Sequence, residues 1–136
     1  MVEINAVYEG TLRCSATHGP SGSTVETDAP VDNHGRGERY SPTDLVATAL
    51  GTCMMTIMGI LATRHEVEMR GTKVRVEKHM TPDPPRRISR LVVDIEVPLA
   101  EDHPQRRAIE KAAVSCPVYL SLHPDIEKAV VFAWVG

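Results

Sequence analysis

Aromatic side chains are scarce in this sequence, in which phenylalanine, tyrosine and tryptophan together make up 4% of 136 residues. The sequence has no long run of basic residues, and its formal net charge is −3. Proteins that bind nucleic acid need clustered cations and, for single strands, aromatic side chains on which bases stack. The composition therefore argues against a nucleic-acid partner.

Cysteine is also sparse. The three cysteines, Cys14, Cys53 and Cys116, form no CxxC pair, and the six histidines are scattered. This spacing argues against a structural zinc site and leaves a mixed Cys/His metal site as a minor alternative. The first residues, MVEINAVYEG, lack the basic and then apolar layout of a signal peptide. We therefore expect a cytoplasmic protein with reduced thiols.

Charge is absent from the stretch between Leu45 and Thr63. Ser41 before this stretch is a good N-cap, and Pro42 suits the first helical position because its missing N–H costs nothing there. Asp44 completes an approximate capping box and favours the positive end of the helix dipole. The sequence predicts one long helix from Ser41 to Arg64.

This helix is long enough to cross a bilayer, but it contains several threonines and has no Trp or Tyr at either end. We therefore expect no membrane partner but a helix that is apolar on all sides and buried. A small domain covers only part of such a helix. Ala47 and Gly51 are four residues apart, as are Met55 and Gly59, and small residues at this spacing let another backbone approach. We expect a homodimer with this helix near the interface.

The other patterns predict a single α+β domain over residues 1–136, with antiparallel strands, segregated helices and the order β-β-β-α-β-β-α-α-β. The N-terminal hairpin is expected to turn at Glu9-Gly10, and Asp102 is expected to cap the second helix. The predicted strands are 2–8, 11–16, 23–28, 67–80, 88–97 and 129–135, and the further helices are 103–115 and a short one after Pro117.

Cys53 lies in the middle of the long helix. In an apolar setting alone its thiol stays protonated and inert, so activation needs a cation from elsewhere. Arg36 and Arg39, on the polar loop before the helix, are the candidates, from the same subunit or from a partner, because arginine stays charged when partly desolvated. We interpret Cys14 as a small, half-buried strand residue.

Cys116 precedes Pro117 and reads as the N-cap of a helix, where N–H groups and the dipole favour a thiolate. If the fold brings Cys53 and Cys116 together, one thiol can form a sulfenic acid and the other can condense with it to a disulfide. Two alternatives stay open. Both cysteines can be buried residues of a structural dimer, or Met54, Met55 and Met58 can line an apolar interface pocket that holds a lipophilic ligand without turnover.

Two segments resemble motifs of the OsmC/Ohr family. SPTDLVATALGTC, which ends at Cys53, is similar to the first cysteine motif, and SCPVYLSL, which contains Cys116, is similar to the second. The order of elements between the motifs also matches. The resemblance covers nearly the whole chain.

The resemblance implies an intertwined homodimer with long central helices packed between sheets and active sites at the subunit interface. It implies a thiol peroxidase of oxidative-stress defence that reduces organic hydroperoxides, and hydrogen peroxide to some degree, without metal or bound cofactor. Cys53 would be the peroxidatic and Cys116 the resolving cysteine. An external thiol, such as a dihydrolipoyl group in some relatives, would supply the electrons.

The sequence departs from the family pattern at the start of the long helix. Thr43 stands where the family often has a glutamate, and the nearest acid is Asp44. On a straight helix Asp44 and Cys53 lie on opposite faces. Asp44 therefore meets its own Cys53 only through a break in the helix, and otherwise acts on a partner's site or serves as a cap, and we favour the cap. The family's activating arginine has no unambiguous counterpart, and Arg39 and Arg36 are candidates by position.

Overall fold

The long helix begins where its capping signals place it. In the computed structural model, which describes residues 1–136, α1 runs from Pro42 to Arg64. The Asp44 N–H donates to the Ser41 hydroxyl oxygen at 3.0 Å, and the Ser41 N–H donates to a carboxylate oxygen of Asp44 at 2.9 Å. This reciprocal pair is a capping box. The predicted helix start and the capping role of Asp44 are confirmed.

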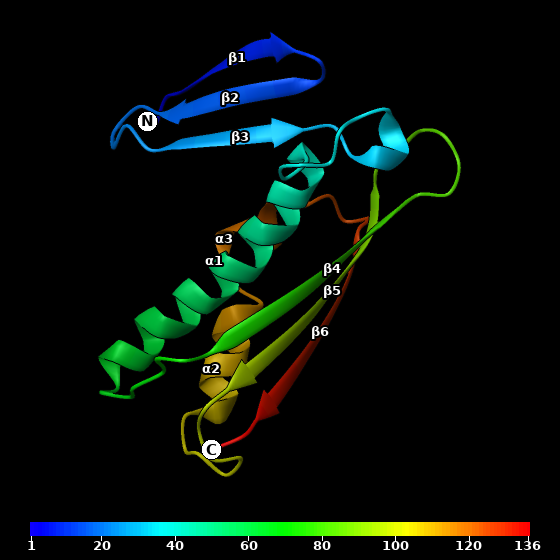
Figure 1. Cartoon of the computed structure of the whole chain (residues 1–136). Helices are drawn as coiled ribbons and strands as arrows, with labels where there is room; N and C mark the ends of the chain where they lie inside the picture. Colours follow the sequence, from blue (N-terminus) through cyan, green and yellow to red (C-terminus); the bar gives the residue numbers. More distant parts are fainter. The chain divides into compact units, whose positions relative to one another are not determined.

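The predicted order of elements is confirmed, with one short 3₁₀ helix (η1) added before α1 (Figure 1). The chain divides into two units, Met1–Val46 and Ala47–Gly136. The elements are β1 (Ile4–Gly10), β2 (Arg13–His18), β3 (Thr24–Asp28), η1 (Val31–Asn33), α1 (Pro42–Arg64), β4 (Lys73–Met80), β5 (Ile88–Val97), α2 (Arg106–Ala113), α3 (Pro117–Ser121) and β6 (Glu127–Trp134).

The first unit contains an antiparallel sheet in the order β1-β2-β3. The predicted turn at Glu9-Gly10 is wrong by two residues. Gly10 still pairs with Arg13, so the turn residues are Thr11 and Leu12, both at positive φ (53° and 63°). The ladder changes register between Tyr8 and Gly10, where Gly10 adopts a φ of 86° that other residues rarely adopt. This change of register shifts the turn from Glu9-Gly10 to Thr11-Leu12.

A buried ion pair ties the loop before α1 to this first sheet. Asp28 is almost fully buried, and Arg13 donates to its two carboxylate oxygens at 2.7 and 2.8 Å. The Glu38 N–H donates to the same carboxylate at 3.2 Å. The hydrogen bonds from Arg13 outweigh the desolvation and lower the pKa of Asp28. The carboxylate therefore stays charged and holds the loop on the sheet.

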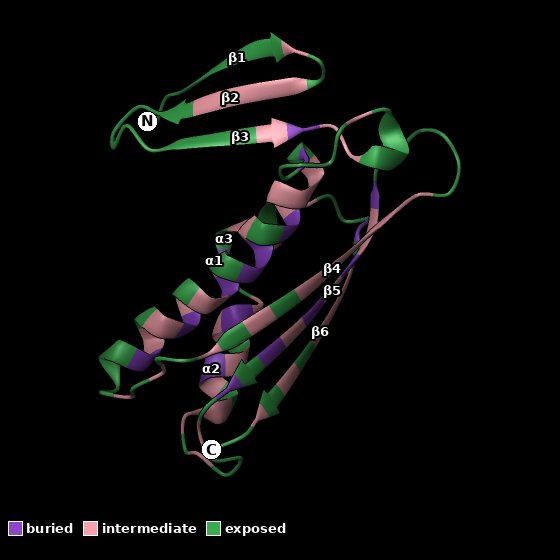
Figure 2. Cartoon of the chain, viewed as in Figure 1, coloured by how far each residue is buried: buried purple, intermediate pink, exposed green.

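The second unit contains a three-stranded sheet in the order β4-β5-β6. β4 and β5 form the predicted antiparallel hairpin, but β5 and β6 are parallel, so the expectation of purely antiparallel strands is wrong for this pair. The cause is the connection, because α2 and α3 carry the chain back across the sheet before β6 starts. Alternate residues of β5 are buried, as its pattern predicts, and α1 and α2 lie over the same face of the sheet (Figures 1 and 2). The buried β5 residues are Ile88, Leu91, Val93, Ile95 and Val97.

α1 is buried along one face within the single chain, rather than on all sides. A Cβ on Gly51 would lie 2.8 Å from a Val76 methyl and 3.2 Å from the Val74 methyls. Gly51 therefore lets α1 approach β4 of its own chain, which corrects its expected place at a subunit interface. A Cβ on Gly59 would have no atom within 4 Å. By length and composition α1 could cross a membrane, and the core helix of a soluble protein passes the same test. The buried residues of α1 are Ala47, Leu50, Gly51, Met54, Met58 and Ala62.

Two predicted element starts are wrong by three residues or more. α2 begins at Arg106 rather than 103, and its N-cap is Gln105, which makes no side-chain cap bond, so Asp102 is not the cap. Pro104 accounts for the exclusion of His103 from the helix, because a proline disfavours helical backbone at the residue before it. β4 begins at Lys73 rather than 67, because turns that include positive-φ residues at 66 and 71 precede it.

The two glycines of α1 form a matched pair for a stability test. Gly51→Ala should lower the free energy of unfolding by about 1–2 kcal/mol, because overpacking against β4 exceeds the gain in helix propensity. Within a single chain, Gly59→Ala should leave it unchanged or raise it by about 0.5–1 kcal/mol, because no atom of the same chain lies within 4 Å of the added methyl. Urea unfolding measures both, and equal effects of the two variants would contradict the assignment of Gly51 to the sheet contact.

Candidate active site

The structure brings Cys53 and Cys116 into contact. Cys53 lies in the middle of α1, and Cys116 directly precedes α3. Their side chains lie close enough to interact, and the neighbouring Cys53 thiol raises the pKa of Cys116. Cys116 is completely buried and Cys53 is half-buried. Two thiols far apart in the sequence thus form one pair, with Cys53 nearer to solvent.

Cys116 is the N-cap of α3, as predicted. Its sulfur accepts a hydrogen bond from the Tyr119 N–H at 3.3 Å, and Pro117 occupies the first helical position. The expected preference for a thiolate is nevertheless outweighed. Burial raises the pKa of the Cys116 thiol, contact with Cys53 raises it further, and the N–H groups of Tyr119 and Val118 only partly oppose this. Cys116 therefore holds its proton beside Cys53.

Aliphatic side chains flank Cys53 along α1. Ala49 and Ile57 lie one turn before and after it and are half-buried, and Ile60 lies two turns on and is 46% exposed. Residues at this spacing share one side of a helix. The thiol therefore lies within an apolar stripe, which suits an approaching molecule with a hydrocarbon part.

The other predicted site residues, Arg36, Arg39 and Asp44, belong to the first unit. Arg36 donates to the Thr11 hydroxyl at 2.6 Å. Arg39 donates to the Glu38 carbonyl at 3.1 Å and makes a longer ion pair of 3.8 Å with Glu26. Their roles toward Cys53 stay predictions.

The remaining sulfur-bearing residues have structural positions. Cys14 lies half-buried on β2, as expected. Met54 and Met58 are fully buried in the core of the second unit, so the expected pocket lined by three α1 methionines is wrong. Only Met55 of the three lines a hollow, with a volume of about 300 Å³, between α1 and the segment 67–72.

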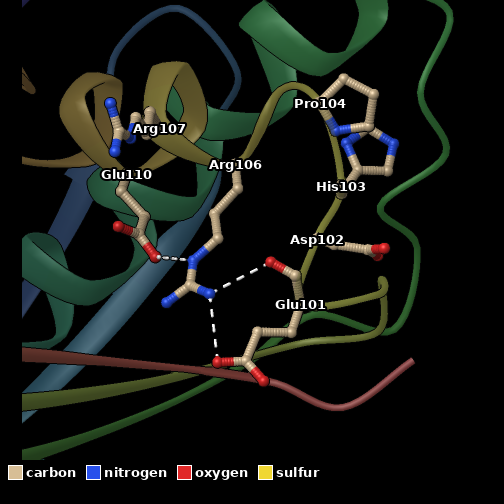
Figure 3. Close-up of a pocket in the computed structure, with 7 residues that line it drawn as sticks. All are labelled: Glu101, Asp102, His103, Pro104, Arg106, Arg107 and Glu110. Carbon is tan, nitrogen blue, oxygen red and sulfur yellow. Dashed lines mark hydrogen bonds and ion pairs between the residues drawn. The ribbon is translucent and has the colours of Figure 1, made fainter.

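A second, open pocket of about 570 Å³ lies at the start of α2 (Figure 3). Arg106 lines this pocket and forms ion pairs with Glu110 at 3.0 Å and with Glu101 at 3.3 Å. The Trp134 indole N–H donates to the same Glu110 carboxylate at 2.8 Å, and the Arg106 guanidinium lies 5.7 Å from the Trp134 ring centroid. These contacts fasten α2 to β6, so the charges of this pocket stabilise the fold.

Sequence reasoning found both cysteines but missed the side chains around α3. Lys128 on β6 lies with its ammonium nitrogen 5.1 Å from the centroid of the Tyr119 ring. No local pattern signals this contact, because it depends on where the chain returns after α3. The Cys-Pro cap was the only local signal in this region.

Comparison with known proteins identifies the family. The model of the OsmC-like protein family matches residues 35–130. The solved structure of a provisionally named osmotic stress induced and detoxification response protein from Psychrobacter arcticus 273-4 is 43% identical and has a TM-score of 0.91, over 97% of this chain and 96% of that one. The chain belongs to the OsmC-like family. No curated protein matches the sequence.

More distant family members share the fold. An organic hydroperoxide resistance protein OsmC from Legionella pneumophila is 12% identical, with a TM-score of 0.78 over 98% of this chain and 96% of that one. An OsmC-like protein from Mycoplasma pneumoniae is 13% identical, with a TM-score of 0.80 over 100% of this chain and 98% of that one. The α+β fold with two three-stranded sheets and a long helix is thus the fold of the family.

The thiol pair predicts a measurable coupling. Because contact with Cys53 contributes to the raised pKa of Cys116, Cys53→Ala in a Cys14→Ser background should lower that pKa. Burial, the larger cause, persists, so the pKa should stay above the ordinary cysteine value. NMR titration of ¹³C-labelled cysteine measures it, with Cys14→Ser alone as the control. An unchanged Cys116 titration would show that the thiols do not interact.

Proposed function

We propose that this protein is a cysteine-based peroxidase that reduces organic hydroperoxides in oxidative-stress defence. The observation that carries the proposal is the contact between the Cys53 and Cys116 side chains. Relatives of the same fold are organic hydroperoxide resistance proteins from Legionella pneumophila and Elizabethkingia anophelis. The aliphatic residues beside Cys53 favour hydroperoxides with a hydrocarbon part over hydrogen peroxide.

The proposed reaction has two steps. The Cys53 thiolate attacks the distal oxygen of the hydroperoxide, the O–O bond breaks, and the alkoxide takes a proton and leaves as an alcohol. The sulfur of Cys116 then attacks the Cys53 sulfenic acid, the S–O bond breaks, and water and a disulfide form. An external dithiol, of which a dihydrolipoyl group is one example, would reduce the disulfide by thiol exchange.

The half-exposed Cys53 and the fully buried Cys116 suit these two roles. A peroxidatic sulfur must meet a substrate from solvent, whereas a resolving sulfur has only to meet its partner. Cys116 retains its proton because burial raises its pKa, so it does not compete for peroxide as a thiolate. The different exposure of the two thiols therefore supports Cys53 as the peroxidatic and Cys116 as the resolving cysteine.

Single substitutions test this assignment. Cys53→Ser should reduce the consumption of cumene hydroperoxide roughly a thousand-fold or more, because it removes the nucleophile. Cys116→Ser should complete one turnover and then stop as a sulfenic acid that dimedone traps. Cys14→Ser is the matched control and should keep full activity. Peroxide consumption by Cys53→Ser at the rate of the unchanged protein would refute the proposal.

A second copy of the chain is proposed to cover the exposed face of α1. Three threonines of this face donate their hydroxyls to α1 carbonyls: Thr52 to Thr48, Thr56 to Thr52 and Thr63 to Gly59, each at 2.8 Å. Their hydrogen bonds need no water, so the face can be buried without leaving these polar groups unsatisfied. The α1 helix of a second copy has the same surface, on which the threonine hydroxyls are already hydrogen-bonded within the helix.

The first sheet also lacks a cover within its own unit. Its first strand exposes Ile4 and Tyr8 on one side and Val7 on the other, and each is more than 60% exposed. Exposed apolar side chains on one strand support the proposal that this strand is part of an interaction surface. A symmetric dimer would cover both exposed surfaces at once.

Sedimentation velocity tests the proposed dimer. The unchanged protein should sediment as a dimer, and Ile60→Glu should shift it toward monomer, because a buried unpaired charge is costly. Val131→Glu is the control, since Val131 is 58% exposed on β6, away from the α1 face. A monomer in the unchanged protein, or equal dissociation by both variants, would contradict the proposal.

Arg39 and Arg36 are the proposed cations that activate Cys53, from the same subunit or from the partner. Arg39 is the less firmly held in its own unit, because its ion pair with Glu26 is 3.8 Å long and both side chains are about half exposed. Arg36 holds the Thr11 hydroxyl at 2.6 Å. This difference favours Arg39, the less constrained of the two arginines, as the proposed activating cation.

A lipophilic binding module is the second candidate function. The hollow beside Met55 favours it, because Val67 and Met69 add apolar side chains to the same lining. The peroxide assay separates the two candidates. Purified protein that carries a lipophilic ligand and consumes no hydroperoxide would favour binding without turnover.

A further inference from the structure

Lys128 reaches from β6 back over the short helix that starts after Cys116. Its ammonium nitrogen lies 5.1 Å from the centroid of the Tyr119 ring and donates to the Ile126 carbonyl at 3.1 Å. Lys128 is half-buried, and a cation above an aromatic ring is attracted more strongly when it is partly removed from water. The two contacts hold together the ends of the segment that joins α3 to β6.

Tyr119 connects Lys128 to the resolving thiol. Its ring faces the lysine, while its backbone N–H donates to the Cys116 sulfur at 3.3 Å. α3 contains five residues, and a helix of that length is not stable by itself in water. Contacts from other elements must therefore fix α3 and with it the direction of the Cys116 sulfur.

The position of Lys128 on β6 is fixed by the sheet, which suits it for such a contact. Lys128 pairs with Leu91 in the parallel ladder, and Leu91 is fully buried in the core of the second unit. The side chain of Lys128 thus extends from the rigid sheet to the least self-supporting helix of this unit. The path from sheet to thiol is Lys128, Tyr119 and Cys116.

We propose that Lys128 is a positioning residue for disulfide formation, because it fixes Tyr119 and thereby the line along which the Cys116 sulfur meets Cys53. The inference rests on the proposed function. In the resolving step the S–O bond of the Cys53 sulfenic acid breaks and the S–S bond forms, with loss of water. Attack on sulfur requires the entering thiol to be aligned, so small displacements of α3 slow this step without affecting the attack on peroxide.

A single-turnover experiment separates the two steps in the full chain with Cys14→Ser. One equivalent of cumene hydroperoxide is added, dimedone trapping reports the sulfenic acid, and mass spectrometry reports the disulfide. In Lys128→Met the sulfenic acid should form at the unchanged rate, and the disulfide should form about five-fold more slowly. Lys128→Arg should restore the rate, because arginine also places a cation on an aromatic ring.

The control is Lys111→Met, an exposed lysine on α2, which should change neither step. Tyr119→Leu should slow the disulfide step as Lys128→Met does, and the double variant should be no slower than either. An unchanged disulfide rate in Lys128→Met would overturn the inference, as would equal slowing of both steps or a failure of Lys128→Arg to restore the rate.

A peroxide-free arm distinguishes failure of this inference from failure of the proposed function. The Cys53 thiolate adds to the N=N bond of diamide and forms a sulfenyl hydrazine. The Cys116 thiol then attacks the Cys53 sulfur, the hydrazine leaves, and the same disulfide forms. If peroxide yields neither a sulfenic acid nor a disulfide in the unchanged protein, the peroxidase proposal fails. The diamide arm still decides the role of Lys128, since displacement should again be about five-fold slower in Lys128→Met.

Discussion

The packing of α1 against its own sheet is the contact on which the rest of the second unit depends. Gly51 makes this contact close, because any side chain there would collide with Val74 and Val76. Met54 and Met58 then fill the core on the same side of the helix. This orientation leaves Cys53 at the edge of the buried face, where it is neither sealed in the core nor fully exposed.

That edge position gives the thiol pair its asymmetry. Cys116 reaches Cys53 from the buried side, at the cap of a short helix, and its own burial raises its pKa despite the N–H of Tyr119. The helix cap and the apolar environment act in opposite directions on the same sulfur, and the environment dominates. A cap that orients a sulfur without ionising it suits the proposed role of Cys116, which is to react with a sulfenic acid on Cys53.

The features predicted correctly from the sequence are local or periodic. The Ser41–Asp44 capping box, the Cys116–Pro117 cap and the alternation of β5 each depend on residues within a few positions of one another. The largest errors come from longer distances, whereas the shifts of the first turn and of the start of α2 have local causes at Gly10 and Pro104. The parallel pairing of β6 depends on a crossover through two helices, and the place of Gly51 depends on β4. Proximity of Lys128 to Tyr119 has no periodic signature at all.

The difference between local and long-range signals also explains why the pair of thiols could be predicted from the sequence, whereas the residue proposed to align it could not. Motifs around Cys53 and Cys116 carry their own helix signals, so each cysteine can be placed separately and the family resemblance can join them. The residue proposed to align this pair, Lys128, acts through a contact between elements, from β6 to Tyr119. A cysteine-based site that is conspicuous in the sequence therefore still needs the fold to show what aligns its second sulfur.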